Sequence, residues 1–135
     1  MTIVTTSRKP VPELRSLAKD LAFAIGCRYV LRGKMGLSAI QSIDPVFFLL
    51  SLEKKDFRIQ LLDHGTAVAD YLIRVREISM RPDEMVEGIL LSNQSVYEEL
   101  KPYIPVKLSG EPEGLLIFDG TRKRRYILRV APHEA

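Results

Sequence analysis

Apolar residues recur along the chain at two different spacings, and these spacings predict helices and strands. Over residues 11–25 they recur about every three to four positions, as in an amphipathic helix with one buried stripe. Residues 2–6 are rich in β-branched side chains and residues 57–62 alternate apolar with polar, as strands do. The run 45–52 is almost continuously apolar, which favours a central strand buried on both faces.

The same pattern predicts the remaining elements and the turns between them. Short helices are expected over 38–43 and after Ser95, which we expect to cap the second of them. Further strands are expected over 28–31, 67–76, 88–93, 106–108, 115–118 and 125–130, with turns at 54–56, 63–65 and 119–120. Two hairpins after a helical unit predict an α/β (α+β) fold, in which helices pack on a mixed sheet.

The chain also contains a weak internal repeat. Residues 1–80 and 81–135 share the order strand, polar turn, helix, short strand and longer antiparallel pair. The segment Ile3-Val4-Thr5-Thr6-Ser7 matches Leu90-Leu91-Ser92-Asn93 only loosely. The order favours two similar halves, and two unrelated β–α units remain the alternative.

Composition indicates a protein with a core of its own. The chain has 135 residues, 46% of them hydrophobic and 27% charged, which is typical of one compact domain. Cys27 is the only cysteine, so nothing indicates disulfides or an oxidising compartment. No signal peptide is visible, and the longest apolar run is far shorter than the roughly 20 residues that span a bilayer. We therefore expect a soluble, cytoplasmic protein with no membrane partner.

The net charge of +3 conceals two basic ends and an acidic middle. Residues 1–34 carry a local charge of +5 and residues 121–135 carry +4, whereas residues 35–120 carry −6. Such asymmetry favours a polyanion partner such as RNA. The alternative is an ordinary solvated surface, where most Lys and Arg side chains lie.

The first basic group lies where a strand leads into a helix. Ser7, Arg8 and Lys9 would meet the positive end of that helix, a favourable place for phosphate. Arg28 and Arg32 are expected to point to one face of the next strand, because side chains alternate along a strand. Arginine binds phosphate and stacks on unpaired bases. The alternative is that these cations pair with the acidic middle segment.

The second basic group follows the turn at 119–120, where a hairpin tip could make a further RNA contact or serve only solubility. The candidate RNA-binding residues are therefore Ser7, Arg8, Lys9, Arg28, Arg32, Lys34, Arg122, Lys123, Arg124 and Arg125.

Catalytic motifs are missing from the sequence. There is no P-loop, no metal-spaced Cys/His set, no HExxH and no GxSxG. His64 and His133 are the only histidines, and neither can be placed beside Cys27 from sequence. We expect no enzyme activity, no cofactor, no metal and no small-molecule substrate.

Two segments together resemble a known family. Thr5-Thr6-Ser7-Arg8-Lys9-Pro10, a helix, and then Arg28-Tyr29-Val30-Leu31-Arg32-Gly33-Lys34-Met35 resemble the N-terminal signature of archaeal Brix-domain proteins. These proteins are similar to eukaryotic U3-snoRNP-associated and large-subunit assembly factors. The resemblance is strong over residues 3–37, and pattern and length carry it over the remainder.

The resemblance implies a ribosome biogenesis factor that binds precursor ribosomal RNA and assists rRNA processing and subunit assembly without catalysis. It implies a single Brix domain over residues 1–135, with halves of about 1–80 and 81–135. Each half would resemble the anticodon-binding domain of class IIa aminoacyl-tRNA synthetases. Ser7, Arg8, Lys9, Arg32 and Lys34 match the signature turns.

The second half departs from this pattern, because Ser92-Asn93-Gln94 stands where a symmetrical basic cluster would be. A second equivalent RNA site is therefore not expected. An alternative function is a protein-interaction scaffold within a ribosome-assembly complex, with other assembly proteins as partners. A third reading, an RNA-modifying or RNA-cleaving enzyme, would need an acid–base set that the sequence does not assemble.

Overall fold

The computed structural model describes residues 2–82, 84–110 and 114–133, which form nine strands and three helices. The strands are β1 (Ile3–Thr6), β2 (Arg28–Tyr29), β3 (Val46–Glu53), β4 (Asp56–Asp63), β5 (Thr66–Met80), β6 (Ile89–Leu91), β7 (Val106–Leu108), β8 (Leu115–Asp119) and β9 (Arg124–Pro132); the helices are α1 (Pro12–Ile25), α2 (Leu37–Ile43) and α3 (Gln94–Leu100). The strands form one sheet in the order β2-β1-β3-β4-β5-β9-β8-β6-β7. Parallel and antiparallel pairs occur together, so the predicted mixed α/β fold is confirmed.

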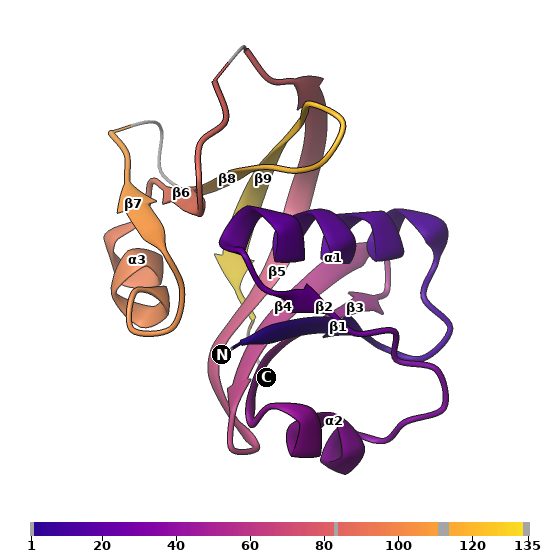
Figure 1. Ribbon diagram of the computed structural model, residues 1–135. Helices are drawn as coiled ribbons and strands as arrows, with labels where there is room; N and C mark the ends of the chain where they lie inside the picture. Colours follow the sequence, from indigo (N-terminus) through magenta and orange to yellow (C-terminus); the bar gives the residue numbers. More distant parts are fainter. Residues whose placement is uncertain (1, 83, 111–113, 134–135) are drawn as a thin grey trace.

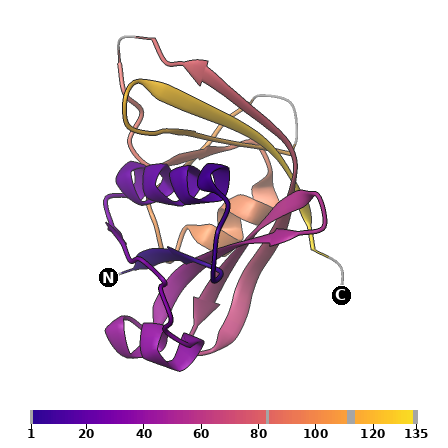
Figure 2. The ribbon, with the colours of Figure 1, turned by 90° about the vertical axis from the view of Figure 1, so that its right-hand side faces the viewer.

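Helices cover both faces of the first part of the sheet. Helices α1 and α2 lie on opposite sides of β1 and β3 (Figures 1 and 2). The larger core joins α1 and α3 to the sheet, and a smaller one lies under α2, where Ile40 packs with Phe47 and Leu62. Strand β3 is thus buried between two helical layers, as its apolar run predicted. No helix within the described ranges has the length and apolar character needed to cross a membrane.

Helix α1 forms where the apolar spacing predicted it. Leu14, Leu17 and Leu21 face the core, and the helix ends at Gly26, whose φ of 69° lies in the left-handed region. The Gly26 backbone N–H bonds the carbonyls of the last turn, as is common where helices end in glycine. The buried stripe also contains a charged residue, Asp20, which apolar spacing alone did not reveal.

Strand ends differ from the predictions because pairing, rather than side-chain alternation, sets them. Strand β2 has two residues instead of the expected four, since only Arg28 and Tyr29 pair with β1. Strand β5 is longer than expected because β9 pairs with it as far as Met80. Strand β9 is correspondingly longer, and β6 is shorter, than predicted. The expected cap of α3 was also wrong, since Asn93 accepts from the backbone N–H of Ser95.

The two halves share the order of elements that the weak repeat indicated. Strands β1 and β2 are parallel and joined through α1, and β6 and β7 are parallel and joined through α3. An antiparallel pair follows in each half, β3–β4 and β8–β9. The halves differ at one connection. Helix α2 precedes β3, which is parallel to β1, whereas β8 is antiparallel to β6 and the described residues between β7 and β8 contain no helix.

The far end of β5 projects beyond the first half. Pairing with β4 ends where Phe57 meets Ile73, and residues beyond Ile73 pair with β9. Val75, Ile78 and Met80 on this segment are each more than half exposed. The projecting segment lies beside α1 and forms one wall of a cavity that is described below.

Candidate nucleic-acid interface

The turn after β1 places two cations at the end of the strand. The Ser7 backbone N–H donates to the Leu50 carbonyl at 2.8 Å, which extends the pairing with β3 by one residue. Arg8 and Lys9 follow and are exposed, and Lys9 has a φ of 53°, in the left-handed region. Helix α1 begins only at Pro12, so Ser7 lies too far from the helix to cap it.

The first turn of α1 offers less to an anion than the sequence suggested. Its N-cap residue is Val11, which has no side-chain cap, and Pro12 has no N–H to donate. Glu13 adds a negative charge in this turn. The cations before the helix, rather than the helix end itself, would therefore have to hold a phosphate.

Arg32 is a buried support for this region. Its side chain is turned inward, where Nε donates to the Met35 carbonyl at 2.6 Å and Nη1 donates to the Thr6 carbonyl at 3.0 Å. These bonds tie the segment after β2 to the end of β1. The expectation that Arg28 and Arg32 share one exposed face is wrong, because the strand ends at Tyr29 and the alternation stops there. Arg28 is exposed and pairs with Ile3 at the start of β1.

Arg8 lies over the same segment. Its Nη2 approaches the Lys34 carbonyl at 3.4 Å, and the side chain of Lys34 is exposed. Burial, and then the positive charge of Arg8, lower the pKa of the Arg32 guanidinium. Two like charges are thus held near each other by backbone carbonyls. Arg8, Lys9, Arg32 and Lys34 together are called the β1 basic cluster below.

No carboxylate forms an ion pair with this cluster in the part of the chain that the structure describes. None of the ion pairs formed there includes a member of the β1 basic cluster or Arg28. Acids of the middle segment instead pair with other cations, as Asp70 does with Arg58 and Asp119 with Arg125. The alternative that the first basic group pairs with the acidic middle is therefore not supported by these contacts.

The second basic group divides into two exposed and two paired side chains. Arg122 and Lys123 form the exposed turn between β8 and β9, with φ values of 56° and 58°. Arg124 contacts Asp20 at 2.9 Å, and Arg125 makes two hydrogen bonds to Asp119, at 2.7 and 2.9 Å. The carboxylates of both pairs are buried, so Arg124 and Arg125 hold the hairpin in place.

Asp20 attaches this hairpin to α1. The sequence did not predict this role. Asp20 accepts from the backbone N–H and hydroxyl of Thr121, from Arg124 and from the Tyr126 hydroxyl. Gly120 lies against it so closely that a Cβ there would be 2.6 Å from the Asp20 side chain. One feature of the sequence could have indicated this role: Asp20 is an acidic residue within the apolar stripe of a helix, and a buried carboxylate needs buried partners.

Asp119 on β8 is a second buried carboxylate that binds an arginine of the hairpin. Burial acts to raise the pKa of its carboxyl, but hydrogen bonds from Arg125 and the Val86 N–H, with the charges of Arg125 and Arg81, hold that pKa below the usual range. The carboxylate form is therefore the one that the fold stabilises.

The two basic groups lie against different parts of α1. The β1 basic cluster lies where the chain leads into the helix, whereas the hairpin is attached at Asp20, about 12 Å further along at the usual helical rise. The structure thus brings Arg8, Arg32 and Lys34 together at one turn, near Lys9. Within the described residues, no contact joins Arg28 or the hairpin tip to them.

The described side chains give little support for a catalytic centre. Burial, and then the charge of Asp44, raise the pKa of Cys27 to about 11, so its thiol stays protonated at neutral pH and is a poor nucleophile. His64 contacts Asp63, and His133 contacts Glu53. Among the residues that the structure describes, no group of three or more His, Cys, Asp or Glu is placed to hold a metal ion.

The fold is shared with solved archaeal proteins. An archaeal Imp4-like protein superimposes with a TM-score of 0.64 at 20% identity, covering 97% of this chain and 99% of the other. A probable ribosomal biogenesis protein from Aeropyrum pernix gives a TM-score of 0.64 at 16% identity, covering 99% and 97%. These likenesses show that the nine-stranded mixed sheet with its helices is an Imp4-like fold.

Sequence comparison identifies two curated homologues. The chain is 31% identical over 87 residues to a probable Brix domain-containing ribosomal biogenesis protein of Methanothermobacter thermautotrophicus, covering 63% of this chain and 56% of the relative. A protein of the same name from Methanococcoides burtonii is 46% identical over 41 residues, 30% of this chain and 26% of the relative. The matches thus span about half the length, or less, of these curated relatives. No protein-family model matches the chain. The resemblance to archaeal Brix-domain proteins is confirmed by these homologues.

Proposed function

We propose that this protein is a ribosome biogenesis factor that binds precursor ribosomal RNA through the β1 basic cluster and assists rRNA processing and subunit assembly without catalysis. The names of its homologues support the ribosome biogenesis role. The residues of the site support the choice of ligand, because RNA is a polyanion whose backbone attracts clustered Lys and Arg.

One observation carries the choice of surface. Backbone carbonyls hold the guanidinium groups of Arg8 and Arg32 on the same segment, and neither has a carboxylate partner among the described residues. Gathering like charges without a counter-charge costs free energy in the unbound protein. A bound phosphate would remove that cost, whereas the ion pairs at Arg124 and Arg125 are already complete. Arg8, Lys9 and Lys34 are thus the proposed contact residues, with Arg32 positioning them.

The other candidate RNA-binding residues would support the β1 basic cluster. Ser7 would orient the turn through its backbone bond to Leu50, and Arg28, Arg122 and Lys123 are exposed cations that can add long-range attraction. Arg124 and Arg125 would act by holding the hairpin. We further propose that the chain is a single Brix domain, whose halves correspond to the anticodon-binding fold that the resemblance implied. A cytoplasmic location stays a prediction.

A protein-interaction scaffold within an assembly complex is the second candidate. The observation that favours it is the projecting end of β5, where three large apolar side chains, Val75, Ile78 and Met80, are exposed. An exposed strand edge with apolar side chains is a common site for a partner segment. Under this scaffold hypothesis, the partners would be other ribosome assembly proteins.

The proposal is tested by salt titrations of binding to precursor rRNA fragments, comparing wild type with Arg8→Ala/Lys9→Ala. The matched control is Lys54→Ala/Lys55→Ala, which removes the same charge from the exposed turn between β3 and β4. The control also matches the backbone, because Lys9 and Lys54 have φ values of 53° and 55°. Circular dichroism and thermal unfolding check that each variant is folded.

We expect wild type to bind with an affinity that falls steeply with salt. The Arg8→Ala/Lys9→Ala variant should bind about 10- to 100-fold more weakly, with a flatter salt slope, because two phosphate contacts are lost. The control should stay within about threefold of wild type, since it changes only the long-range attraction. Equal losses in both variants would contradict a localised site, and no binding by wild type at low salt would favour the scaffold.

A further inference from the structure

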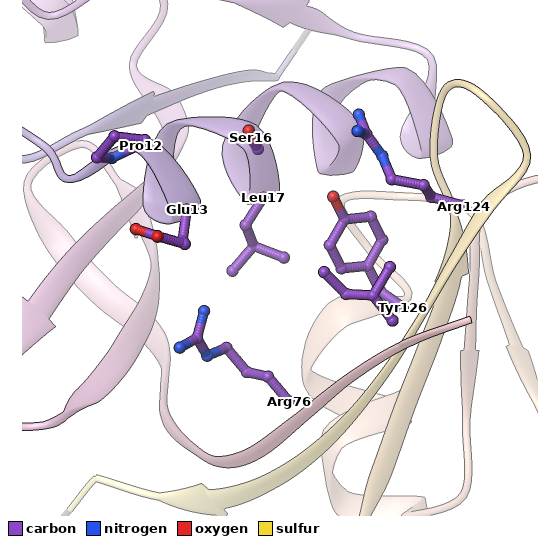
Figure 3. A pocket seen from close by; sticks show the side chains of 8 residues that line it. Pro12, Glu13, Ser16, Leu17, Arg76, Arg124 and Tyr126 are labelled. Atoms are coloured by element: carbon purple, nitrogen blue, oxygen red, sulfur yellow. The ribbon is translucent and has the colours of Figure 1, made fainter. Parts of the chain in front are cut away.

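A cavity opens beside the first turns of α1, the helix that follows Arg8 and Lys9 in the chain. It has a volume of about 250 Å³, and its walls come from α1, β5 and β9. Leu17, Ile78 and the ring of Tyr126 form an apolar lining, and Glu13, Ser16, Arg76 and Arg124 contribute polar groups (Figure 3). The cavity is several times larger than the roughly 30 Å³ of a water molecule. It therefore has room for one planar ring system.

Arg76 gives this cavity a flat cationic wall. Its guanidinium lies over the ring of Phe57, 3.9 Å from the ring centre, so the aromatic ring supports it from one side. A guanidinium supported in this way can stack a second planar group on its other face. Arg76 is exposed and forms no ion pair among the described residues. Its charge is thus available to a ligand in the cavity.

The position of the cavity links it to the β1 basic cluster. Pro12 and Glu13, the first residues of α1, line the cavity, and Arg8 and Lys9 precede Pro12 by four and three residues in the chain. A nucleic-acid backbone held by Arg8 and Lys9 would therefore lie near the end of α1 that lines the cavity. Glu13 supplies a carboxylate that can accept from the amino or imino groups of a base, which a phosphate site alone would not need.

We infer that this cavity holds one unstacked nucleobase of single-stranded RNA, placed between Arg76 and the apolar lining, while the β1 basic cluster binds the adjoining phosphates. The inference rests on the proposed RNA-binding function and adds a base-binding subsite to it. Single-stranded RNA is commonly held by stacking unpaired bases on aromatic or guanidinium planes. An apolar side chain of a protein partner is the competing occupant.

The test uses the full chain and a single-stranded oligoribonucleotide that contains one 2-aminopurine, whose fluorescence reports base stacking. Ser16→Phe fills the mouth of the cavity without changing any charge, and its control is Ser42→Phe on the exposed side of α2. Arg76→Ala removes the flat wall, and its control is Arg74→Ala, which removes an equal charge from the same strand. Affinity, salt slope and 2-aminopurine fluorescence are measured for each variant after its fold is verified.

The wild-type complex should change the 2-aminopurine fluorescence, and both cavity variants should lose that change. Each should bind about tenfold more weakly, the equivalent of one stacked base, and Ser16→Phe should keep the wild-type salt slope. Both controls should behave as wild type. If RNA binds but the cavity variants match their controls, the base subsite is wrong and the protein side chain becomes the favoured occupant. If wild type binds no RNA at low salt, the proposed function itself fails.

Discussion

The turn from β1 into α1 and the turn from β6 into α3 occupy equivalent places in two β–α–β units, but their polar side chains do different things. At the first turn, Arg8 and Lys9 are exposed, and no carboxylate partner for them lies in the described part of the chain. At the second turn, Asn93 caps α3 and the Ser92 hydroxyl accepts from the Leu115 N–H. Asn93 and Ser92 hold the backbone and carry no charge, whereas the exposed charges of Arg8 and Lys9 can attract an anion, so an equivalent position does not make an equivalent site.

The cavities beside the two helices show the same contrast. Two arginines, Arg76 and Arg124, and one acid, Glu13, line the cavity at α1. Two acids, Asp70 and Glu99, line the one at α3, together with His133. An acidic lining would repel an RNA backbone at neutral pH. The comparison therefore favours the proposal that RNA binds mainly at the first half.

The largest expected effect concerns the attachment of the hairpin to α1. Asp20→Ala should lower the free energy of unfolding by about 3 kcal/mol or more, because it removes a buried acceptor from several donors, including Arg124. Urea denaturation measures this loss. RNA affinity of the folded variant should fall less than that of Arg8→Ala/Lys9→Ala, because the only parts of the proposed RNA site that Asp20 holds are the cavity residues Arg124 and Tyr126. A loss as large as that of Arg8→Ala/Lys9→Ala would break the contrast between the two basic groups.

A somewhat smaller effect is expected for the support of the β1 basic cluster. Arg32→Met keeps an unbranched stem but removes the donors to Thr6 and Met35, and should cost about 2 kcal/mol of stability. It should also weaken RNA binding, since Lys34 is no longer held near Arg8. If chemical denaturation shows no change, Arg32 is not the support that its contacts indicate.

The Asp119–Arg125 pair predicts a dependence of stability on pH. Because the folded protein lowers the pKa of Asp119, this pair stabilises the fold above the usual aspartate pKa of about 4, and the contribution disappears as pH falls through the lower folded value. Thermal unfolding of wild type should show this loss of stability at low pH. Asp119→Asn should be less stable at neutral pH, by about 1–3 kcal/mol, and should lose less on acidification. Parallel pH profiles for the two proteins would contradict this assignment.

The smallest effect is expected at the exposed hairpin tip. Arg122→Ala/Lys123→Ala should weaken RNA binding by only about two- to threefold, because these side chains contribute long-range attraction that salt screens. Titrations at two salt concentrations measure this. A loss that equals the effect of Arg8→Ala/Lys9→Ala would instead make the tip a second direct contact.

Local spacing predicted much of the fold. The apolar stripe of α1, the continuous run of β3 and the hairpin turns were all visible because they depend on neighbouring residues. The candidate site was predictable in part: the sequence located Arg8, Lys9 and Lys34, which lie in exposed turns. It did not reveal the roles of Arg32 and Arg124, because their partners depend on folding. Asp20 and Arg124, for example, are 104 positions apart in the chain.

The most direct test of the account is photo-crosslinking of precursor rRNA fragments to the wild-type protein, with the crosslinked residues identified by mass spectrometry. The account predicts crosslinks within residues 7–17 and 32–36, with further ones near Arg76. Crosslinks concentrated on residues 93–99 or 67–71, around the acidic cavity at α3, would contradict the assignment of RNA binding to the first half.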